Sequence, residues 1–316
     1  MELFELIQTL NRAHGPSGDE GEIREVIRAL AEPYADEITA DTMGSLIVHR
    51  RGKGPKLLLA AHMDSIGFVV THIEKEGFLR VGRLGGVSPK EAAYTPVRFK
   101  SGLRGVFAPE EKADFGKLKL DECFLDIGAG DEAAAKQLVQ VGDSAVYDTP
   151  AFRTGDLVVS PYLDDRISCA VLLSTLERIG ECPNDLYLVF TAQEEVGLRG
   201  ARTAAWSIAP ERAGTARLGR GAAVKVMDSS VICHPAMVAL LEDTAREGDI
   251  PVQRDIMRAG GTDAGAIHLT RTGVITGGIS VPCRYIHTPA ETASLSDADA
   301  CVRLAAALAQ RPLEQP

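Results

Sequence analysis

Apolar residues recur along the chain at two spacings, which separate predicted helices from predicted strands. Helical spacing over residues 3–10 predicts an N-terminal helix that the Gly-Pro pair at 15–16 ends. A second helix follows, with Ser17 or Asp19 as its N-cap. Residues 56–62 form a continuous apolar run, which predicts a central strand covered by helices on both faces. The remaining segments of this kind are predicted helices at 167–179, 237–246 and 297–310 and predicted strands at 45–49, 186–191, 222–227 and 274–280.

Residues from about 66 to 160 differ from this pattern. Short β-rich stretches are interrupted there by Gly, Pro and charged residues, which predicts a small β domain. Because helices and strands alternate before and after it, the simplest fold is an α/β domain with a mixed sheet flanked by helices and interrupted by this insertion. The expected domains are residues 1–64 with 161–316, and residues 65–160. The predicted strands of the insertion are 67–73, 78–81, 97–100 and 102–107.

Composition excludes several classes of protein. The 316 residues are 45% hydrophobic and 25% charged, which is typical of a globular chain and not of a disordered or collagen-like one. The net charge of −10 argues against a nucleic-acid partner. No apolar run reaches the roughly 18–20 residues of a membrane span, so no membrane partner is expected. The start of the chain lacks a secretory signal and the six cysteines form no CxxC pair, so we expect a cytoplasmic protein with reduced thiols.

Four polar clusters stand at the ends of predicted strands or the start of a predicted helix. In open α/β sheets such positions surround the ligand. The clusters contain His62 and Asp64, then Asp164 and Asp165, then Glu194 and Glu195, and finally His287.

Each cluster has a chemical and an ordinary structural explanation. His62 and Asp64 share one face of an extended segment, so a carboxylate could orient a metal-binding imidazole. The neighbouring carboxylates Glu194 and Glu195 repel each other, and a metal would compensate them. The ordinary alternatives stay open at this point: helix N-capping by Asp164, solvated strand ends and a structural His287. Together the four clusters form a mixed nitrogen and oxygen ligand set that suits zinc, cobalt or manganese.

The motifs around these clusters resemble the glutamyl aminopeptidase / cellulase M family of cocatalytic metallopeptidases, which includes the large tetrahedral aminopeptidases. The resemblance follows the family order and covers nearly all of the catalytic domain. The motifs are GPSGDE (15–20), AAHMDSIGF (60–68), GDLVVSPYLDDRISCAVLL (155–173), FTAQEEVGLRGA (190–201), GGTDAGAIHLTRTGV (260–274) and RYIHTPAE (284–291).

The resemblance implies a role for each candidate residue. His62 and His287 resemble the imidazole ligands of two divalent metal ions, with zinc or cobalt expected above other metals. Asp164 resembles the carboxylate that bridges them, and Glu195 a terminal ligand. Glu194 resembles the general base that activates water, and Asp64 the carboxylate that orients His62. The expected substrates are short peptides. Residues 65–160 resemble a dimerisation domain whose dimers build a larger shell.

One part of the chain departs from the family pattern. Family members carry one more terminal carboxylate, an Asp in a DVT-like strand after the Glu-Glu pair. Here the segment around residues 211–221 is shortened, and that Asp is absent. Asp228 is the nearest acid but matches another family position, so it is not assigned as a ligand. One metal position is therefore expected to be weakened, and the sheet to lose a strand or to close differently.

Three functions remain open from the sequence. The first is a metal-dependent aminopeptidase, with Glu194 as the base. The second is a degenerate, weakly active or non-catalytic oligomer that lacks one metal ligand. The third is a glycosidase, which the cellulase name suggests; the adjacent Glu194 and Glu195 are unsuited to it, because its two carboxyls must face each other across a sugar.

Overall fold

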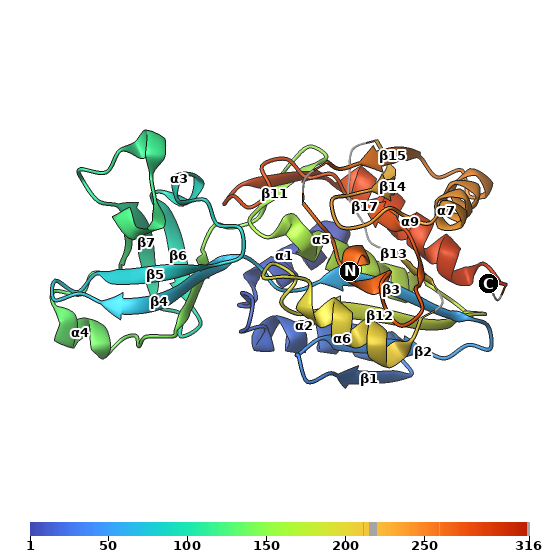
Figure 1. Ribbon diagram of the computed structural model, residues 1–316, viewed down its shortest axis with the longest axis horizontal. Coiled ribbons are helices and arrows are strands. Elements are labelled where there is room, and N and C mark those ends of the chain that lie inside the picture. The colour runs from blue at the N-terminus through green and yellow to red at the C-terminus, as the bar shows by residue number, and fades with distance from the viewer. Residues whose placement is uncertain (211, 215–219, 259, 315–316) are drawn as a thin grey trace.

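The chain folds into a larger α/β body and a smaller β-barrel (Figure 1). The structure, a computed structural model, describes residues 1–210, 212–214, 220–258 and 260–314. Mixed α/β architecture was the fold class expected from the sequence, and it is confirmed. None of the described helices combines the length and the apolar character needed to cross a membrane.

A six-stranded mixed sheet forms the centre of the larger body. Its order is β1-β2-β12-β3-β13-β16. The pairs β1–β2 and β2–β12 are antiparallel, whereas the pairs β12–β3, β3–β13 and β13–β16 are parallel. The strands are β1 (Glu37–Ala40), β2 (Leu46–Arg50), β3 (Lys56–His62), β12 (Asp185–Thr191), β13 (Arg212–Gly214) and β16 (Ile275–Thr276).

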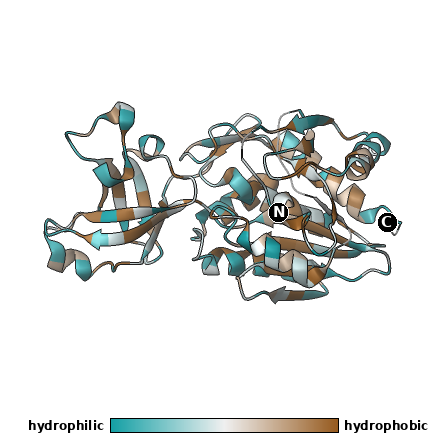
Figure 2. Cartoon of the chain, viewed as in Figure 1, coloured by the Kyte–Doolittle hydropathy of each residue, from teal (hydrophilic) through white to brown (hydrophobic). Residues whose placement is uncertain are grey.

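Alternation along β3 explains why helices cover both faces of this sheet. Leu57 and Leu59 enter the core under one layer of helices, whereas Leu58 and Ala60 enter a second core on the opposite face. The central strand is therefore apolar at almost every position, as the continuous apolar run predicted. The hydrophobic colouring follows these interior strands (Figure 2).

Helices and two small sheets complete the larger body. The sheets have the orders β15-β14-β17 and β10-β11-β18. The helices are α1 (Leu3–Arg12), α2 (Gly21–Ala31), α5 (Leu163–Arg178), α6 (Arg199–Ile208), α7 (Pro235–Glu247), α8 (Ala264–Ile267) and α9 (Leu295–Gln310). The strands of the small sheets are β10 (Phe152–Thr154), β11 (Leu157–Ser160), β14 (Ala222–Met227), β15 (Val252–Ile256), β17 (Gly278–Ser280) and β18 (Glu291–Ser294).

The smaller body is a closed barrel with the strand order β4-β5-β8-β7-β6-β9, closed by pairing of β4 with β9. It has its own core, in which Phe68 stacks on Phe107. Two of its strands, β8 and β9, each four residues long, were not predicted from the sequence. Its elements are β4 (Gly67–Ile73), β5 (Leu79–Leu84), α3 (Pro89–Ala92), β6 (Thr95–Phe99), β7 (Arg104–Pro109), β8 (Cys123–Asp126), α4 (Glu132–Lys136) and β9 (Ser144–Tyr147).

The prediction of a single strand at 274–280 is wrong, because the segment divides into two strands at Gly277. Its first part, β16, joins the central sheet, and its second part, β17, pairs with β14. A Cβ atom at Gly277 would lie 2.4 Å from Cγ of Met237. Helix α7 therefore packs directly on the backbone at the point where the chain changes sheets.

The expected N-cap of the second helix is also wrong. Helix α2 begins after Glu20, and neither predicted residue caps it. Ser17 instead donates a hydrogen bond to Asp64 at 2.6 Å, and Asp19 pairs with Lys100 at 2.5 Å. Long-range partners therefore replace the local capping bonds.

The shortened segment still supplies a strand to the central sheet. The backbone of β13 pairs with β3 and with β16, so the sheet closes with a three-residue strand. Glu211 and residues 215–219 of this segment lie outside the described residues. The β13 pairing ends at Gly214 opposite Leu59, three positions before His62 in β3. Its described residues thus stop short of the sheet edge where β3 ends.

A fully buried arginine joins the N-terminal segment to the sheet edge by hydrogen bonds. The Arg166 guanidinium, on α5, is completely shielded from solvent and lies 5.2 Å from the ring of Tyr162. Burial lowers the pKa of Arg166 to about 10, which leaves it charged at neutral pH. It donates hydrogen bonds of 2.8–3.3 Å to the carbonyl oxygens of Leu10, Ala13, Gly15 and Met63.

We expect Arg166→Met to lower the free energy of unfolding by roughly 3 kcal/mol, because buried carbonyls would lose their donor. Urea unfolding followed by circular dichroism measures the change. Arg178→Met is the control, since Arg178 is half exposed and makes only a surface pair with Asp299; its cost should stay below about 0.5 kcal/mol. Equal losses in the two variants would contradict this account of Arg166.

Candidate active site

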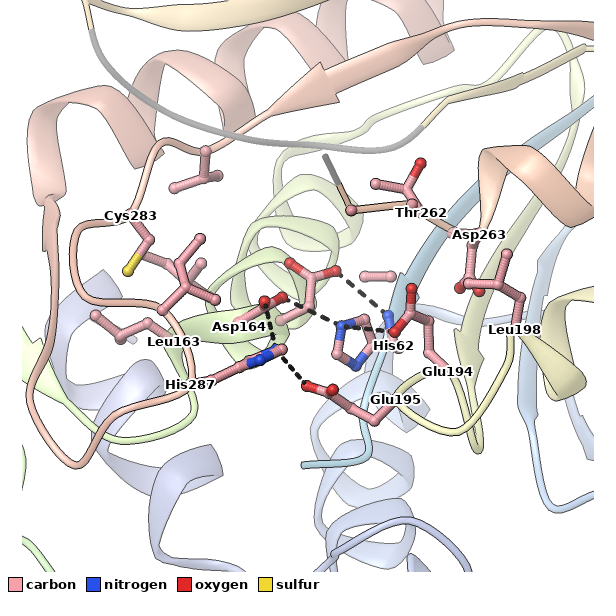
Figure 3. Close-up of a pocket in the computed structure, with 18 of the residues that line it drawn as sticks. His62, Leu163, Asp164, Glu194, Glu195, Leu198, Thr262, Asp263, Cys283 and His287 are labelled. Carbon is pink, nitrogen blue, oxygen red and sulfur yellow. Dashed lines mark hydrogen bonds and ion pairs between the residues drawn. The ribbon is translucent and has the colours of Figure 1, made fainter. Parts of the chain in front are cut away.

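Segments that are far apart in the sequence meet at one edge of the central sheet (Figure 3). In the parallel pair of β3 and β12, His62 lies opposite Thr191, so the residues after both strands leave the sheet at the same level. Asp164 comes from the start of α5, where its backbone angles and those of Asp165 depart from the helix. This edge collects His62 from the end of β3, Asp164 from α5, Glu194 and Glu195 from the segment after β12, and His287 from the segment before β18.

Asp164 lies between the two imidazoles. Its Oδ1 is 3.2 Å from Nε2 of His62, and its Oδ2 is 3.6 Å from Nε2 of His287. Oε1 of Glu195 lies 3.3 Å from the same nitrogen of His287. Ligand atoms of His62, Asp164 and Glu195 all lie within 4.8 Å of one another. A carboxylate that turns one oxygen toward each imidazole has the arrangement needed to bridge two cations.

Asp64 is buried and holds the neighbouring segment in place. Its carboxylate accepts hydrogen bonds from the backbone N–H of Glu194 at 2.9 Å and of Glu195 at 3.3 Å. The Nδ1 atom of His62 lies 3.1 Å from the carbonyl oxygen of Asp64 and 3.6 Å from its carboxylate. Asp64 therefore contacts His62 mainly through its backbone, while its side chain fixes the two glutamates.

Glu291 is a site residue that the sequence analysis missed. Only 1% of it is exposed, and its two oxygens each accept a backbone N–H at 2.8 Å, one from Asp164 and one from His287. Burial and the nearby Asp164 raise the pKa of Glu291 well above its usual range. Its position at the end of the RYIHTPAE motif was the available signal.

The ionisable groups of the site respond to buried negative charge. Burial alone would lower the pKa of His62, but the carboxylates of Glu194 and Asp164 raise it well above its usual value. Burial would also lower the pKa of His287, but Glu195 and Asp164 raise it to about 9. Burial raises the pKa of Glu194 well above its usual range.

These shifts mean that the pocket lacks positive charge. Imidazoles take up protons and carboxylates retain theirs, because no lysine or arginine among the described lining residues balances the buried acids. A divalent cation supplies that charge, and two imidazoles with several carboxylates form a donor set suited to zinc or cobalt. The residues present therefore fit a metal centre.

Asp263 is a second sign that the pocket lacks positive charge. It is 3% exposed, and Thr191 donates to its Oδ2 at 2.5 Å. Its other oxygen, Oδ1, is buried without a hydrogen-bond partner among the described residues. Burial raises the pKa of Asp263 to about 6. The motif that contains it, GGTDAGAIHLTRTGV (260–274), was the available signal.

Both carboxylate oxygens of Asp228 already accept hydrogen bonds. Its Oδ1 accepts hydrogen bonds from the backbone N–H groups of Ser230 and Val231 at 2.7 and 3.0 Å, and its Oδ2 accepts one from Thr262 at 2.8 Å. Asp228 is therefore not among the residues that face the cavity.

The barrel reaches the site through a pair of glycines after β5. A Cβ atom on Gly86 would lie 2.4 Å from Nδ1 of His287, and one on Gly85 would lie 3.0 Å from Cβ of Glu195. Gly85 also has a positive φ of 74°. Bare backbone from the barrel thus contacts the imidazole and the carboxylate, and the Gly-Gly pair in the sequence was the overlooked signal.

Beside these residues is a cavity of about 420 Å³, a size typical of small-molecule sites. His62, Asp164 and His287 face it, as do both glutamates (Figure 3). The structure therefore brings all six predicted site residues to one place and gives a small substrate access to them.

Comparison with known proteins agrees with this geometry. Residues 44–304 match the M42 glutamyl aminopeptidase family. A putative aminopeptidase of Acetivibrio thermocellus is 43% identical over 96% of this chain and 97% of its own length. A lysyl aminopeptidase of Pyrococcus furiosus is 34% identical over 96% of both chains. The Pyrococcus horikoshii TET1 peptidase, which can assemble into a tetrahedron or a large octahedral shell, matches with a TM-score of 0.90, 30% identity and coverage of 98% and 99%.

Family, fold and site all indicate hydrolysis of peptide bonds at the N-terminus of a substrate. The divalent-metal requirement expected from the sequence is consistent with the family and with the cluster of ligands. The chain belongs to the M42 glutamyl aminopeptidase family of metallopeptidases.

Proposed function

We propose that this aminopeptidase removes N-terminal residues from short peptides by means of water activated between two divalent ions. The observation that carries the proposal is the position of Asp164, with one carboxylate oxygen 3.2 Å from His62 and the other 3.6 Å from His287. A single imidazole beside an acid would support one ion at most. Two imidazoles on opposite sides of one carboxylate support a pair.

The residues divide between the two metal positions. His62 and Asp164 would hold the first ion, and Asp164, Glu195 and His287 the second. Zinc or cobalt is the expected metal, given the mixed nitrogen and oxygen donors. When bound, two such ions lower the pKa of a shared water and polarise the carbonyl of the scissile bond.

Glu194 is the proposed general base. Its Oε2 lies 3.8 Å from Nε2 of His62, so it borders the first metal position without belonging to the ligand cluster. Burial raises its pKa, which suits a carboxylate that must accept a proton from water and return it to the leaving amine. Asp64 positions Glu194 through the backbone N–H, and Glu291 positions Asp164 and His287 in the same way.

The barrel, within the proposed domain 65–160, is the proposed dimerisation domain, and residues 1–64 with 161–316 form the proposed catalytic domain. Strands β10 and β11, at the end of the 65–160 range, pair with β18 and so belong with the larger body. The barrel exposes large apolar side chains, among them Phe115 at 45% and Val141 at 61%, which suit a protein interface. Assembly of dimers into a shell would resemble that of the TET1 peptidase. A cytoplasmic location is part of the proposal and is supported by six cysteines present as free thiols.

We expect Glu194→Gln to lower kcat by about 10²–10⁴-fold, because the amide cannot accept the water's proton, while the metal content stays unchanged. Turnover of an aminoacyl p-nitroanilide and elemental mass spectrometry measure the two effects. Glu181→Gln, at an exposed acid of the same body, should change neither. Full turnover in the Glu194 variant would remove this residue from the role of base.

The first metal position has only His62 and Asp164 as assigned ligands, one fewer than a typical catalytic zinc site. We therefore expect calorimetric titration with Zn²⁺ to give two binding events whose dissociation constants differ by tenfold or more. Affinity at the second position should rise with pH up to about 9, since the proton on His287 must leave first. Binding of one ion or none would instead favour the degenerate, non-catalytic homologue.

Gly86→Ala should weaken metal binding at the His287 position by about 10–100-fold, because the added methyl group would push the imidazole out of line. Calorimetric titration measures the loss. The control is Gly130→Ala, where no atom lies within 4 Å of the added carbon. Unchanged affinity in the Gly86 variant would show that His287 has room to move.

A further inference from the structure

The cavity at the metal centre has two chemically different sides (Figure 3). Glu194 and Asp263 lie on one side, near Leu198. On the opposite side, Leu163 and Cys283 lie beyond Asp164 and His287. We define the apolar wall as four residues that line the cavity: Leu163 and Cys283, together with Val281 and Ile286 from the chain segment that contains Cys283.

The apolar wall adjoins the reacting groups in the sequence and in space. Leu163 precedes Asp164, and Ile286 precedes His287. Leu163 and Val281 are buried at 0% and 3% exposure, so they support the wall from behind, and the partly exposed Cys283 and Ile286 form the part that a substrate can contact. Cys283 donates its thiol hydrogen to the carbonyl of Arg284 at 3.4 Å, which leaves the wall without an unused strong donor. In the proposed function the scissile carbonyl binds at the metal positions beside Asp164 and His287, so the first side chain of the peptide can lie against this wall.

The charges that line the cavity disfavour ionic side chains. Among the described residues that line it there is no lysine or arginine, and every charged group apart from the two imidazoles is a carboxylate. Arg284, the neighbour of Cys283, is exposed and does not line the cavity. Among these described residues an acidic side chain would face like charge without a lysine or arginine partner, and a lysine ammonium would be desolvated against the apolar wall.

We propose that the enzyme prefers peptides whose N-terminal residue is neutral and apolar, about the size of leucine, over peptides that begin with an acidic or a basic residue. The apolar wall is the specificity surface. The names of relatives do not decide this point, since the family is described as glutamyl while one matching relative is a lysyl aminopeptidase. The inference rests on the proposed function and adds its substrate class.

The first test compares kcat/KM for leucine, glutamate and lysine p-nitroanilides with the Zn²⁺-loaded, full-length enzyme. We expect the leucine substrate to exceed each of the other two by tenfold or more, as is typical for discrimination by an apolar pocket. An equal or higher value for glutamate or lysine would overturn the inference.

Binding of the free amino acids separates this inference from the proposed function. Hydrolysis of none of the three substrates with two ions bound would overturn the proposed function. Calorimetry on the same loaded enzyme then still tests the wall: tighter binding of L-leucine than of L-glutamate and L-lysine supports the inference, and equal or weaker binding overturns it.

Charged variants of the wall give the second test. Cys283→Lys should raise the ratio of glutamate to leucine turnover tenfold or more, and Cys283→Asp should do the same for lysine. The matched controls are Leu269→Lys and Leu269→Asp, at a residue that is 72% exposed and outside this cavity; their ratios should not change. Unchanged ratios in both folded Cys283 variants would overturn the assignment of the wall. If they do not fold, the comparison on the unmodified enzyme decides.

Discussion

Buried negative charge around Asp164 is the constraint on which the rest of the site depends. Several carboxylates share one cavity, and the described residues offer only two imidazoles as compensation. The raised pKa of His287, about 9, and the unpartnered Oδ1 of Asp263 are both consequences of that deficit. A metallopeptidase site is stable in this form because bound cations, and not neighbouring basic side chains, balance the acids.

Such a site must also be held rigid, because its carboxylates repel one another. The fold achieves this with backbone hydrogen bonds: Asp64 receives the N–H groups of both glutamates, and Glu291 receives those of Asp164 and His287. Arg166 acts behind them by joining the N-terminal segment to the end of β3. The ligands are therefore positioned through the main chain, which leaves their side chains free to face the cavity.

The two bodies of the molecule are not independent at the site. The barrel sends Gly86 against the ring of His287, so a ligand from the larger body is packed against backbone from the smaller one. In contrast, the shortened segment contributes a strand, β13, that stops opposite Leu59 and adds no described acid at the sheet edge. The insertion thus supports the proposed metal position at His287, while the shortened segment leaves the other proposed position with fewer ligands.

Sequence alone determined the features that local pattern encodes. The continuous apolar run of β3 predicted helices on both faces, and motifs at the ends of strands and at the start of a helix identified all six predicted site residues that the structure brings together, from His62 to His287. Tertiary structure decided what depends on distant partners. Glu291 pairs with a residue 127 positions away, and the strand expected at 274–280 divides because Met237 packs on Gly277. Such contacts leave no periodic trace in the chain, since they exist only after folding has brought separate segments together.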